Sequence, residues 1–313
     1  MNPLILDTDG GVDDAQALLM LIAAGRVPEA VTTCFGNVGL AAATRNILTV
    51  LAVAGCDVPV HAGQERPLTA PLIDATYIHG EDGLGGAPRP AEIGQGASDD
   101  AVGFLRRRLR EAARDGQPVD ILAIGPLTNI ALALRLEPGI AAGIGMLTIM
   151  GGTLWGRGNT TAAAEFNVYA DPEAAAIVFQ ADVATTVVPW EPCVAHALEG
   201  PEVDALFDGD AQDDYHAFSL ALAQHARRTT VGYGGPDVFR FVDPFAAAVV
   251  IDPDIITASI EASVDVALAP GLARGMTLVD PTGRLGTPPV RLVETGDMAK
   301  LTELFARSIR WRP

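Results

Sequence analysis

The chain has 313 residues and a formal net charge of −18, which excludes a polyanionic partner, because nucleic-acid binding depends on basic surface that displaces counterions. Hydrophobic residues make up 49% of the chain and aromatic residues only 5%, so the core must consist mainly of aliphatic side chains. The sequence has no apolar run of about 18 residues, no basic leader after Met1, and three scattered cysteines (Cys34, Cys56 and Cys193) without metal-binding spacing; we expect a soluble, cytoplasmic protein with reduced thiols and no membrane partner.

Strand-like and helix-like segments alternate over the first 190 residues or so. Such alternation is typical of βαβ units, in which helices connect parallel strands. It predicts an α/β fold with an open, mostly parallel central sheet flanked by helices, in a single domain covering residues 1–313. The predicted strands are Leu4–Leu6, Ala30–Cys34, Val119–Ile124, Leu147–Met150 and Thr185–Val188, and the predicted helices are Ala15–Ala24, Ala43–Ala54, Thr128–Leu136 and Pro172–Gln180.

The rest of the chain departs from this alternation. Residues 69–98 are rich in Gly, Pro and small polar residues, and a loop of that length in a compact domain is usually functional, so we expect it to be mobile. A helical pattern covers Asp204–Thr230, Val231–Gly235 interrupts it, small residues predict a helix over Asp243–Val250, and short β-like runs precede a last helix near Asp297–Arg310.

Four aspartates, Asp7, Asp9, Asp13 and Asp14, follow the first predicted strand directly. Carboxylates held a few ångström apart repel one another, so they must bind protons, stay solvated or enclose a cation. A Leu-rich helical pattern comes next, which places the acids on a strand-to-helix loop, where ligands of open α/β sheets bind. The alternative is a solvated turn in which one Asp caps the helix. Because a cap needs only one acid, the cluster favours a cation site.

Polar residues also follow other predicted strands. Asn37 lies past the second strand, and Ile124 and Met150 end two later ones. A polar loop runs from Asn159 to Asn167, and Asp243 stands alone before a helix. Together they offer carboxylate, amide and carbonyl oxygens, which suit Ca²⁺ or Mg²⁺ better than Zn²⁺, and a flexible set of about six to eight suits Ca²⁺.

The order of these motifs resembles the inosine-uridine nucleoside hydrolase family. The resemblance covers most of the chain and is strongest in Asp7-Thr8-Asp9-x-Gly11-x-Asp13-Asp14-Ala15. It implies hydrolysis of the N-glycosidic bond of ribonucleosides to free base and ribose, in nucleoside salvage. The other matching segments are Gly36-Asn37-Val38-Gly39, Thr44-Arg45-Asn46, His79-Gly80, Gly125-Pro126-Leu127-Thr128-Asn129-Ile130-Ala131, Met150-Gly151-Gly152, Glu165-Phe166-Asn167 and Asp243-Pro244.

This resemblance implies a Ca²⁺ at the bottom of the pocket. Its protein ligands would be Asp9, Asp14, Asp243 and the carbonyl oxygen of Ile124, with a water and the ribose 2′ and 3′ hydroxyls completing the shell. Asp9 would be the general base that takes a proton from this water, which attacks the anomeric carbon. Calcium fixes the ribose and lowers the pKa of the water without redox chemistry.

The resemblance also implies substrate contacts and an assembly. Members of the family form dimers and tetramers, so we expect a homodimer or homotetramer that binds a small nucleoside. The implied substrate-binding residues are Asp13, Asn37 and Asn167 at the ribose hydroxyls, Asn159 and Glu165 at the 5′-hydroxyl, Met150 against the sugar, and Phe166 beside Glu165.

The chain departs from the family just before its last metal-binding Asp. One branch has His there, proposed to protonate the leaving purine, and another has Trp, whereas this chain has Val242. General acid catalysis is worth roughly 10²–10⁴ in rate, so another group must supply the proton or the leaving group must need less help. The candidates are His79, His225 and Tyr233, each of which could instead be structural. Gly10 also replaces the usual Pro, which we expect to loosen the loop.

Three alternative functions agree with parts of the sequence. Leu6-Asp7-Thr8-Asp9-Gly10-Gly11 also resembles the DxDG opening of haloacid-dehalogenase-type phosphatases, but these need an active-site lysine, and Lys300 in the last predicted helix is the only lysine. A non-catalytic or very slow ribose- or nucleoside-binding protein, or a hydrolase of an unusual N-ribosyl compound, would agree with Val242. The sequence does not specify the preferred base, which depends on loops near residues 75–86 and 225–242.

Overall fold

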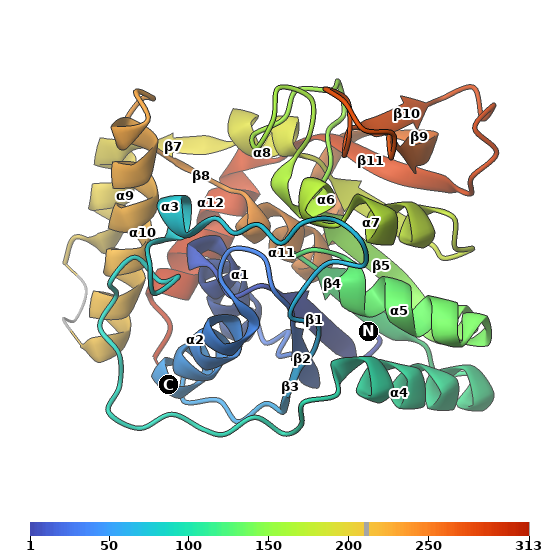
Figure 1. Ribbon diagram of the computed structural model, residues 1–313. Coiled ribbons are helices and arrows are strands. Elements are labelled where there is room, and N and C mark those ends of the chain that lie inside the picture. Colours follow the sequence, from blue (N-terminus) through green and yellow to red (C-terminus); the bar gives the residue numbers. More distant parts are fainter. Residues whose placement is uncertain (210–212, 313) are drawn as a thin grey trace.

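Nine strands pair into one sheet at the centre of the molecule (Figure 1). The computed structural model describes residues 1–209 and 213–312. The strands of the sheet are β1 (Leu4–Thr8), β2 (Ala30–Thr33), β3 (Val60–Ala62), β4 (Val119–Ala123), β5 (Ile144–Met150), β6 (Thr185–Val188), β9 (Ile256–Val266), β10 (Thr277–Asp280) and β11 (Pro289–Gly296). Their spatial order is β10-β9-β11-β6-β5-β4-β1-β2-β3. All neighbours from β11 to β3 are parallel, and only β9 runs antiparallel to β10 and β11. The predicted mostly parallel α/β sheet is confirmed.

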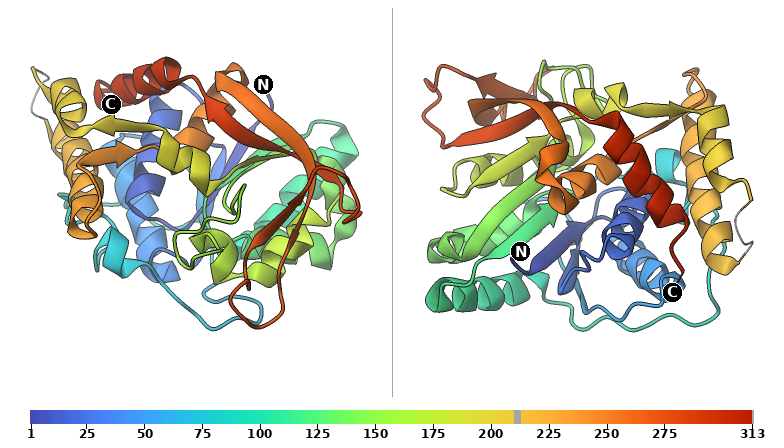
Figure 2. Two further views of the ribbon diagram at one scale, coloured as in Figure 1. Left: turned by 90° about the horizontal axis from the view of Figure 1, so that it is seen from above. Right: turned by 180° about the vertical axis from the view of Figure 1, so that it is seen from behind.

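Helices cover both faces of the sheet (Figure 2). Successive side chains of a strand point to opposite faces, so Leu4 and Leu6 of β1 enter one core while Ile5 enters the other. No helix within the described residues is long and apolar enough to cross a membrane. The first core is covered by α1 (Val12–Ala23), α2 (Leu40–Val53), α9 (Gly200–Phe207), α10 (Asp214–Gly232), α11 (Asp243–Ile251) and α12 (Met298–Ile309), and the second by α4 (Ala101–Asp115), α5 (Thr128–Leu136) and α7 (Pro172–Phe179).

The strand order reverses between β1 and β4. From β1 the chain adds β2 and β3 on one side, then returns through α4 to place β4 on the other side of β1. In open α/β sheets a ligand crevice opens at such a point, outside the carboxyl ends of the strands. Asp9, Asn37, Ile124 and Met150 all lie at or just past these ends.

Several elements differ from the sequence prediction. The prediction missed β3, α4 and a separate two-stranded antiparallel sheet of β7 (Ala197–Glu199) and β8 (Val238–Arg240). The helical pattern predicted over about Asp204–Thr230 corresponds to two helices, because α9 ends at Phe207 and α10 begins at Asp214; residues 210–212 of that prediction lie outside the described residues. The short elements are α3 (Thr76–His79), η1 (Pro138–Gly143), α6 (Phe166–Ala170), α8 (Trp190–Ala195) and η2 (Pro253–Ile255).

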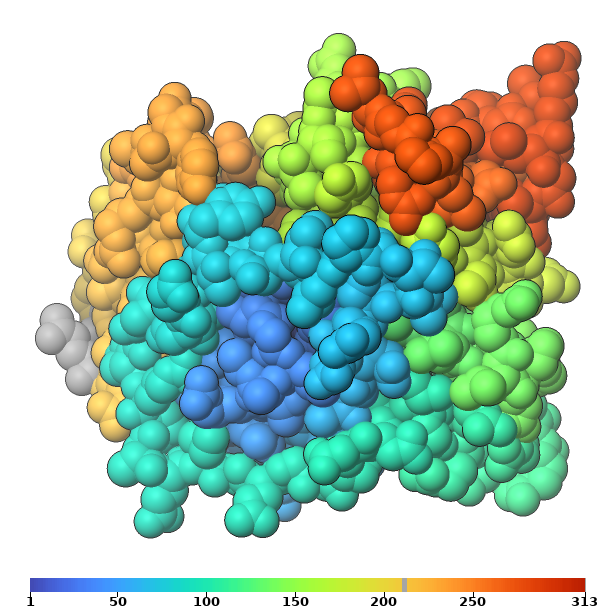
Figure 3. Space-filling model, in the orientation of Figure 1, coloured from blue at the N-terminus to red at the C-terminus, as the bar shows by residue number. Residues whose placement is uncertain are grey.

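The predicted loop at residues 69–98 has internal structure and anchors. It contains α3, and Leu84 within it is fully buried. Asn46 of α2 donates a hydrogen bond to the carbonyl oxygen of Asp82 at 2.9 Å and accepts one from Arg89 at 2.9 Å. Figure 3 shows this segment lying across the N-terminal part of the chain. The mobility of the segment stays a prediction.

Candidate active site

Three of the four clustered aspartates are fully buried: Asp7, Asp9 and Asp14. The solvated-turn alternative is therefore wrong. Asp14 is the third residue of α1, and its Oδ2 accepts a hydrogen bond from the Gly11 N–H at 2.8 Å. Its Oδ1 accepts from the Thr8 hydroxyl and from the Asp9 N–H. Asp14 thus closes the helix N-terminus, where the helix dipole stabilises negative charge.

Asn37 ties Asp9 to Asp14. Its backbone N–H donates to Asp9 Oδ2 at 2.7 Å, and its Nδ2 donates to Asp9 Oδ1 and to Asp14 Oδ2, both at 2.9 Å. The backbone passes so close that a Cβ on Gly36 would lie 1.9 Å from Asp9 Oδ2, so the site requires glycine before Asn37. Each Asp9 oxygen accepts one bond from Asn37 and keeps a further lone pair, since a carboxylate has about four acceptor positions.

Asp7 and Gly10 support the cluster from either side. Asp7 Oδ2 accepts bonds from Thr32 Oγ1 at 2.5 Å and Asn129 Nδ2 at 2.9 Å, which fixes β1 against its neighbours, and burial raises the pKa of Asp7 to about 6. Gly10 has φ +69°, which proline cannot adopt. A Cβ there would also lie 2.6 Å from the Cα of Ala43. Gly10 therefore lets the loop pack tightly against α2. The expectation that Gly10 loosens the loop is wrong.

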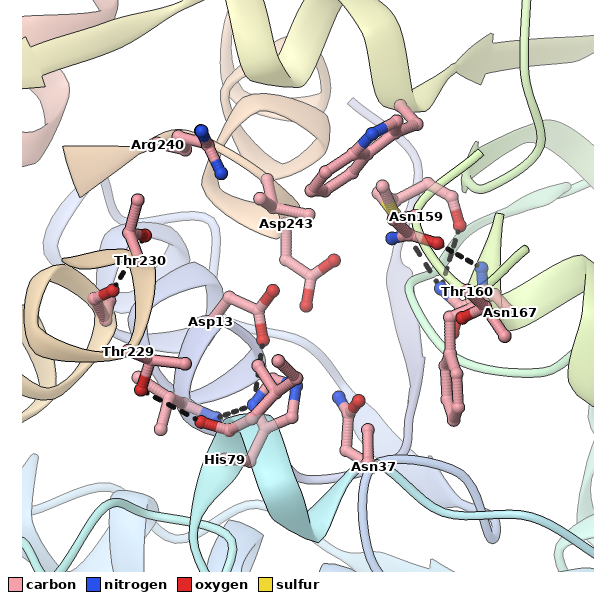
Figure 4. A pocket seen from close by; sticks show the side chains of 18 of the residues that line it. Asp13, Asn37, His79, Asn159, Thr160, Asn167, Thr229, Thr230, Arg240 and Asp243 are labelled. Atoms are coloured by element: carbon pink, nitrogen blue, oxygen red, sulfur yellow. Dashed lines mark hydrogen bonds and ion pairs between the residues drawn. The ribbon is translucent and has the colours of Figure 1, made fainter. Parts of the chain in front are cut away.

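Asp13, Asp14 and Asp243 place carboxylate oxygens within 4.8 Å of one another. Figure 4 shows Asp13 and Asp243, from α1 and α11, facing the same cavity. Burial, followed by repulsion from Asp13, raises the pKa of both Asp14 and Asp243, and burial raises that of Asp13 to about 6. Asp13 Oδ1 is buried without a hydrogen-bond partner; His79 Nδ1 lies 3.6 Å away. Protons or a cation must neutralise such a group, and an all-oxygen donor set fits a hard cation.

The carbonyl oxygen of Ile124 lies at the carboxyl end of β4 and already has a partner. Asn167 Nδ2 donates to it at 3.1 Å and to the Met150 carbonyl oxygen at 3.2 Å. Asn167 thus bridges the ends of β4 and β5. All three residues line the cavity, so the structure brings these predicted metal and sugar contacts together.

Glu165 and Asn159 organise the start of α6. Glu165 Oε1 accepts from Asn167 N at 2.8 Å, and Oε2 accepts from Gly152 N at 2.8 Å. Asn159 Oδ1 accepts from Phe166 N at 2.8 Å, which leaves its Nδ2 to face the cavity as a donor. Burial raises the pKa of Glu165 to about 7. These residues therefore position the loop as well as lining the cavity.

The three proposed leaving-group residues also line the cavity. His79 Nδ1 accepts from Val12 N at 3.1 Å, so the proton of the neutral ring is on Nε2, and burial lowers the pKa of His79 to about 4. His225 Nε2 lies 2.8 Å from the Ile78 carbonyl oxygen, to which it must donate. Tyr233 is 64% exposed. All three side chains thus contact the backbone: His79 Nδ1, His225 Nε2 and, at 3.5 Å from the Tyr77 carbonyl oxygen, the Tyr233 hydroxyl.

The cavity has a volume of about 460 Å³, within the usual range for small-molecule sites. Sequence analysis missed some of the residues that line it. Trp190 offered a signal, because it follows β6 almost directly; the other side chains reach the cavity only through the packing of α1, α10 and β8. The missed residues include Gln16, Trp190, Thr229, Thr230 and Arg240.

An acidic, cation-compatible site at the switch point of a parallel α/β sheet defines the class of protein. The chain matches the family described as inosine-uridine preferring nucleoside hydrolase over residues 4–303, and it belongs to that family. Its members cleave N-ribosyl bonds, so the predicted family, fold and enzyme class are confirmed.

Individual relatives agree with this assignment. The chain is 36% identical over 286 residues to the non-specific ribonucleoside hydrolase RihC of Salmonella enteritidis, covering 91% of this chain and 90% of that protein. It is 35% identical over 261 residues to uridine nucleosidase 1 of Arabidopsis thaliana, covering 81% and 75%. Among solved structures, the plant nucleoside hydrolase PpNRh1 superimposes with a TM-score of 0.89 at 28% identity, covering 100% of this chain and 99% of that one.

Proposed function

We propose that this protein uses Ca²⁺ to hydrolyse the N-glycosidic bond of ribonucleosides, releasing base and ribose. One observation carries the proposal: Asp13 and Asp243 line a cavity of about 460 Å³, and their carboxylate oxygens and one of Asp14 lie within 4.8 Å of one another. Ribose hydroxyls are donors that such oxygens accept, and carboxylates stabilise the positive charge that develops on the sugar ring as the bond breaks. The family and its relatives support the same reaction.

The residues that would hold the cation are Asp14, Asp243 and the Ile124 carbonyl, together with Asp13, which the resemblance had given to the sugar alone. Ca²⁺ is favoured over Mg²⁺ because it accepts more oxygen ligands in a less regular geometry. When bound, it fixes the sugar hydroxyls and makes a water more acidic. Asp9 lies beside Asp14 behind Asn37, and its place as a fifth ligand stays a prediction.

Asp9 is the proposed general base. Both of its oxygens keep a free lone pair, and burial followed by repulsion from Asp14 raises the pKa of its carboxyl group. A carboxylate with a raised pKa accepts a proton more readily than a solvated one. Water gives a proton to Asp9 while its oxygen bonds to the anomeric carbon, and the C1′–N bond breaks with its electron pair passing to the base.

The remaining predicted residues position the nucleoside. Asn37 and Asn167 place amides where ribose hydroxyls would meet the carboxylates, and Asn159 Nδ2 serves the 5′-hydroxyl. Met150 and Phe166 supply apolar contact. Glu165 supports this wall through the bonds that it accepts from Asn167 and Gly152. These roles rest on the residues lining one cavity.

The base, the assembly and the cellular role are finer points of this proposal. Relatives are named for uridine, for inosine and guanosine, for purines, and as non-specific, so their names favour no base. We propose a homodimer or homotetramer acting in nucleoside salvage, on the strength of the family resemblance, and a location in the cytoplasm.

The test is ribose release from a panel of purine and pyrimidine nucleosides, with added Ca²⁺ and after exhaustive chelation. We expect release that chelation abolishes and Ca²⁺ restores better than Mg²⁺. Equal restoration by both ions would contradict the assignment of Ca²⁺. A folded, Ca²⁺-loaded protein that releases no ribose from any nucleoside would favour a binding role or an unusual N-ribosyl substrate.

A further inference from the structure

The cavity has one fixed positive charge. Arg240, the last residue of β8, is the only lysine or arginine among the described residues that line it. Figure 4 shows its side chain directed into the cavity, on the same side as Asp243. Within residues 1–209 and 213–312 its guanidinium makes no hydrogen bond or ion pair, although the chain has 39 acidic residues against 21 basic ones. Nearby Arg227, by contrast, bonds both oxygens of Asp237.

Gln16 gives a second, independent sign of a ligand-binding position. It lines the same cavity from α1, one turn after Asp13, and is 4% exposed. Its Nε2 is buried without a hydrogen-bond partner. A buried donor left unpaired costs roughly 1–3 kcal/mol, so the site is arranged for an acceptor that the protein itself does not supply.

The hydrogen-bond donors that α10 contributes to the cavity already have acceptors. The Thr229 hydroxyl donates to the Ile78 carbonyl oxygen at 3.2 Å, and the Thr230 hydroxyl donates to that of Ala226 at 3.1 Å. His225 Nε2 also contacts the Ile78 oxygen. Among the described side chains that line the cavity from α10 and β8, together with Gln16, the Arg240 guanidinium and Gln16 Nε2 are therefore the donors without an acceptor. Both suit a group rich in oxygens or carrying negative charge.

The leaving base is such a group. When the C1′–N bond breaks, its electron pair stays on the base nitrogen, which carries negative charge until it is protonated. Val242 cannot donate a proton, and both His79 Nδ1 and His225 Nε2 are engaged with backbone groups. A fixed cation placed where charge develops stabilises the transition state without any proton transfer.

We propose that Arg240 is the leaving-group residue of this enzyme, holding the departing base as an anion, with Gln16 donating to the same base. This inference rests on the proposed function. The water oxygen ends on C1′, its proton on Asp9, and the base leaves with the bonding pair and takes a proton from solvent afterwards. The reaction consumes one water and needs no other reactant. Its rate then depends on how readily the base bears negative charge.

The test varies the leaving group and the charge together. Arg240→Met keeps the length of the side chain without its charge, Arg240→Lys keeps the charge, and Arg228→Met on α10 is the control, since Arg228 is exposed and outside the cavity. The substrates are uridine, 5-fluorouridine and p-nitrophenyl β-D-ribofuranoside, whose leaving groups are increasingly stable as anions. Values of kcat and KM are measured for each, and thermal melting confirms folding.

We expect Arg240→Met to lower kcat for uridine by about 10²–10³, less for 5-fluorouridine, and under about tenfold for the nitrophenyl riboside. Arg240→Lys should recover part of the loss, and Arg228→Met should match the wild type. Gln16→Met should lower kcat for uridine by about fivefold, the value of one hydrogen bond.

Three outcomes would overturn the inference. An equal loss on all three substrates would show a structural role for Arg240. A raised KM with unchanged kcat would show that Arg240 only binds the base. If Arg240→Met cleaves both uridine and the nitrophenyl riboside as fast as the wild type does, Arg240 does not stabilise the leaving base. The proposed function would still stand in that case. If the wild type cleaves neither these three substrates nor any purine nucleoside, the proposed function fails, and this inference fails with it.

Discussion

The two walls of the cavity are built differently. The acid wall, formed by Asp13, Asn37, Ile124 and Asp243 with Asp9 and Asp14 behind Asn37, comes from strand ends and helix starts, and its side chains are largely buried. The base wall, formed by His225 and Thr229 of α10, Tyr233 directly after it and Arg240 of β8, is part-exposed, and its hydrogen bonds are few. The sheet thus fixes the groups proposed to act on the sugar, whereas the proposed contacts of the leaving base lie on a helix and a short strand that can change without disturbing the sheet.

Removing the proposed general base, the carboxylate of Asp9, should have the largest effect on the rate. We expect Asp9→Ala to lower kcat by about 10²–10⁴ or more on every nucleoside alike, because the water is common to all substrates. Asp115→Asn is the control, since that carboxylate pairs only with its neighbour Arg114 on the surface. Steady-state ribose release gives kcat, and circular dichroism checks the fold. Activity within tenfold of the wild type would move the general base to another acid.

The difference between the walls also explains what sequence alone could predict. Acid-wall residues lie next to the strands that carry them, so periodicity and motif order suffice to bring Asp9, Asn37 and Ile124 to one edge. Gln16 and Arg240 meet in one cavity only because α1 and β8 pack around it, and no local pattern encodes a contact across more than 200 positions.

The missed and merged elements have local causes. In α4, the buried Leu105, Leu109 and Ala112 follow helical spacing, so this helix was predictable from its pattern. Three-residue strands such as β3 and β7 are too short to show alternation. The continuous helical pattern over Asp204–Thr230 hid the break after Phe207, which Gly209 with φ +80° marks.

A smaller effect should appear in the stability of the fold between about pH 4.5 and 7, where Glu165 titrates. Burial raises the pKa of Glu165 from 4.5 to about 7 in the folded protein. The fold therefore favours the protonated form, and this contribution is complete below pH 4.5 and is lost as the pH rises towards 7. In chelator, the free energy of unfolding of the wild type should fall relative to Glu165→Gln by about 1–3 kcal/mol over that range, since one pKa unit corresponds to ~1.4 kcal/mol. Urea titrations at several pH values measure it, and parallel profiles for the two proteins would contradict it.

The smallest effect should come from the rim of the base wall. Tyr233 is 64% exposed, its hydroxyl lies 3.5 Å from the Tyr77 carbonyl oxygen, and the two rings meet edge to face at 6.4 Å. A weak, solvated hydroxyl contact contributes little, so Tyr233→Phe should change kcat/KM by less than about threefold. Tyr233→Ala removes the ring itself and should raise KM by about two- to tenfold with kcat unchanged, because an aromatic contact is worth about 0.5–1.5 kcal/mol. A large loss of kcat in Tyr233→Phe alone would instead make this hydroxyl the proton donor, and the leaving base would then not depend on the charge of Arg240.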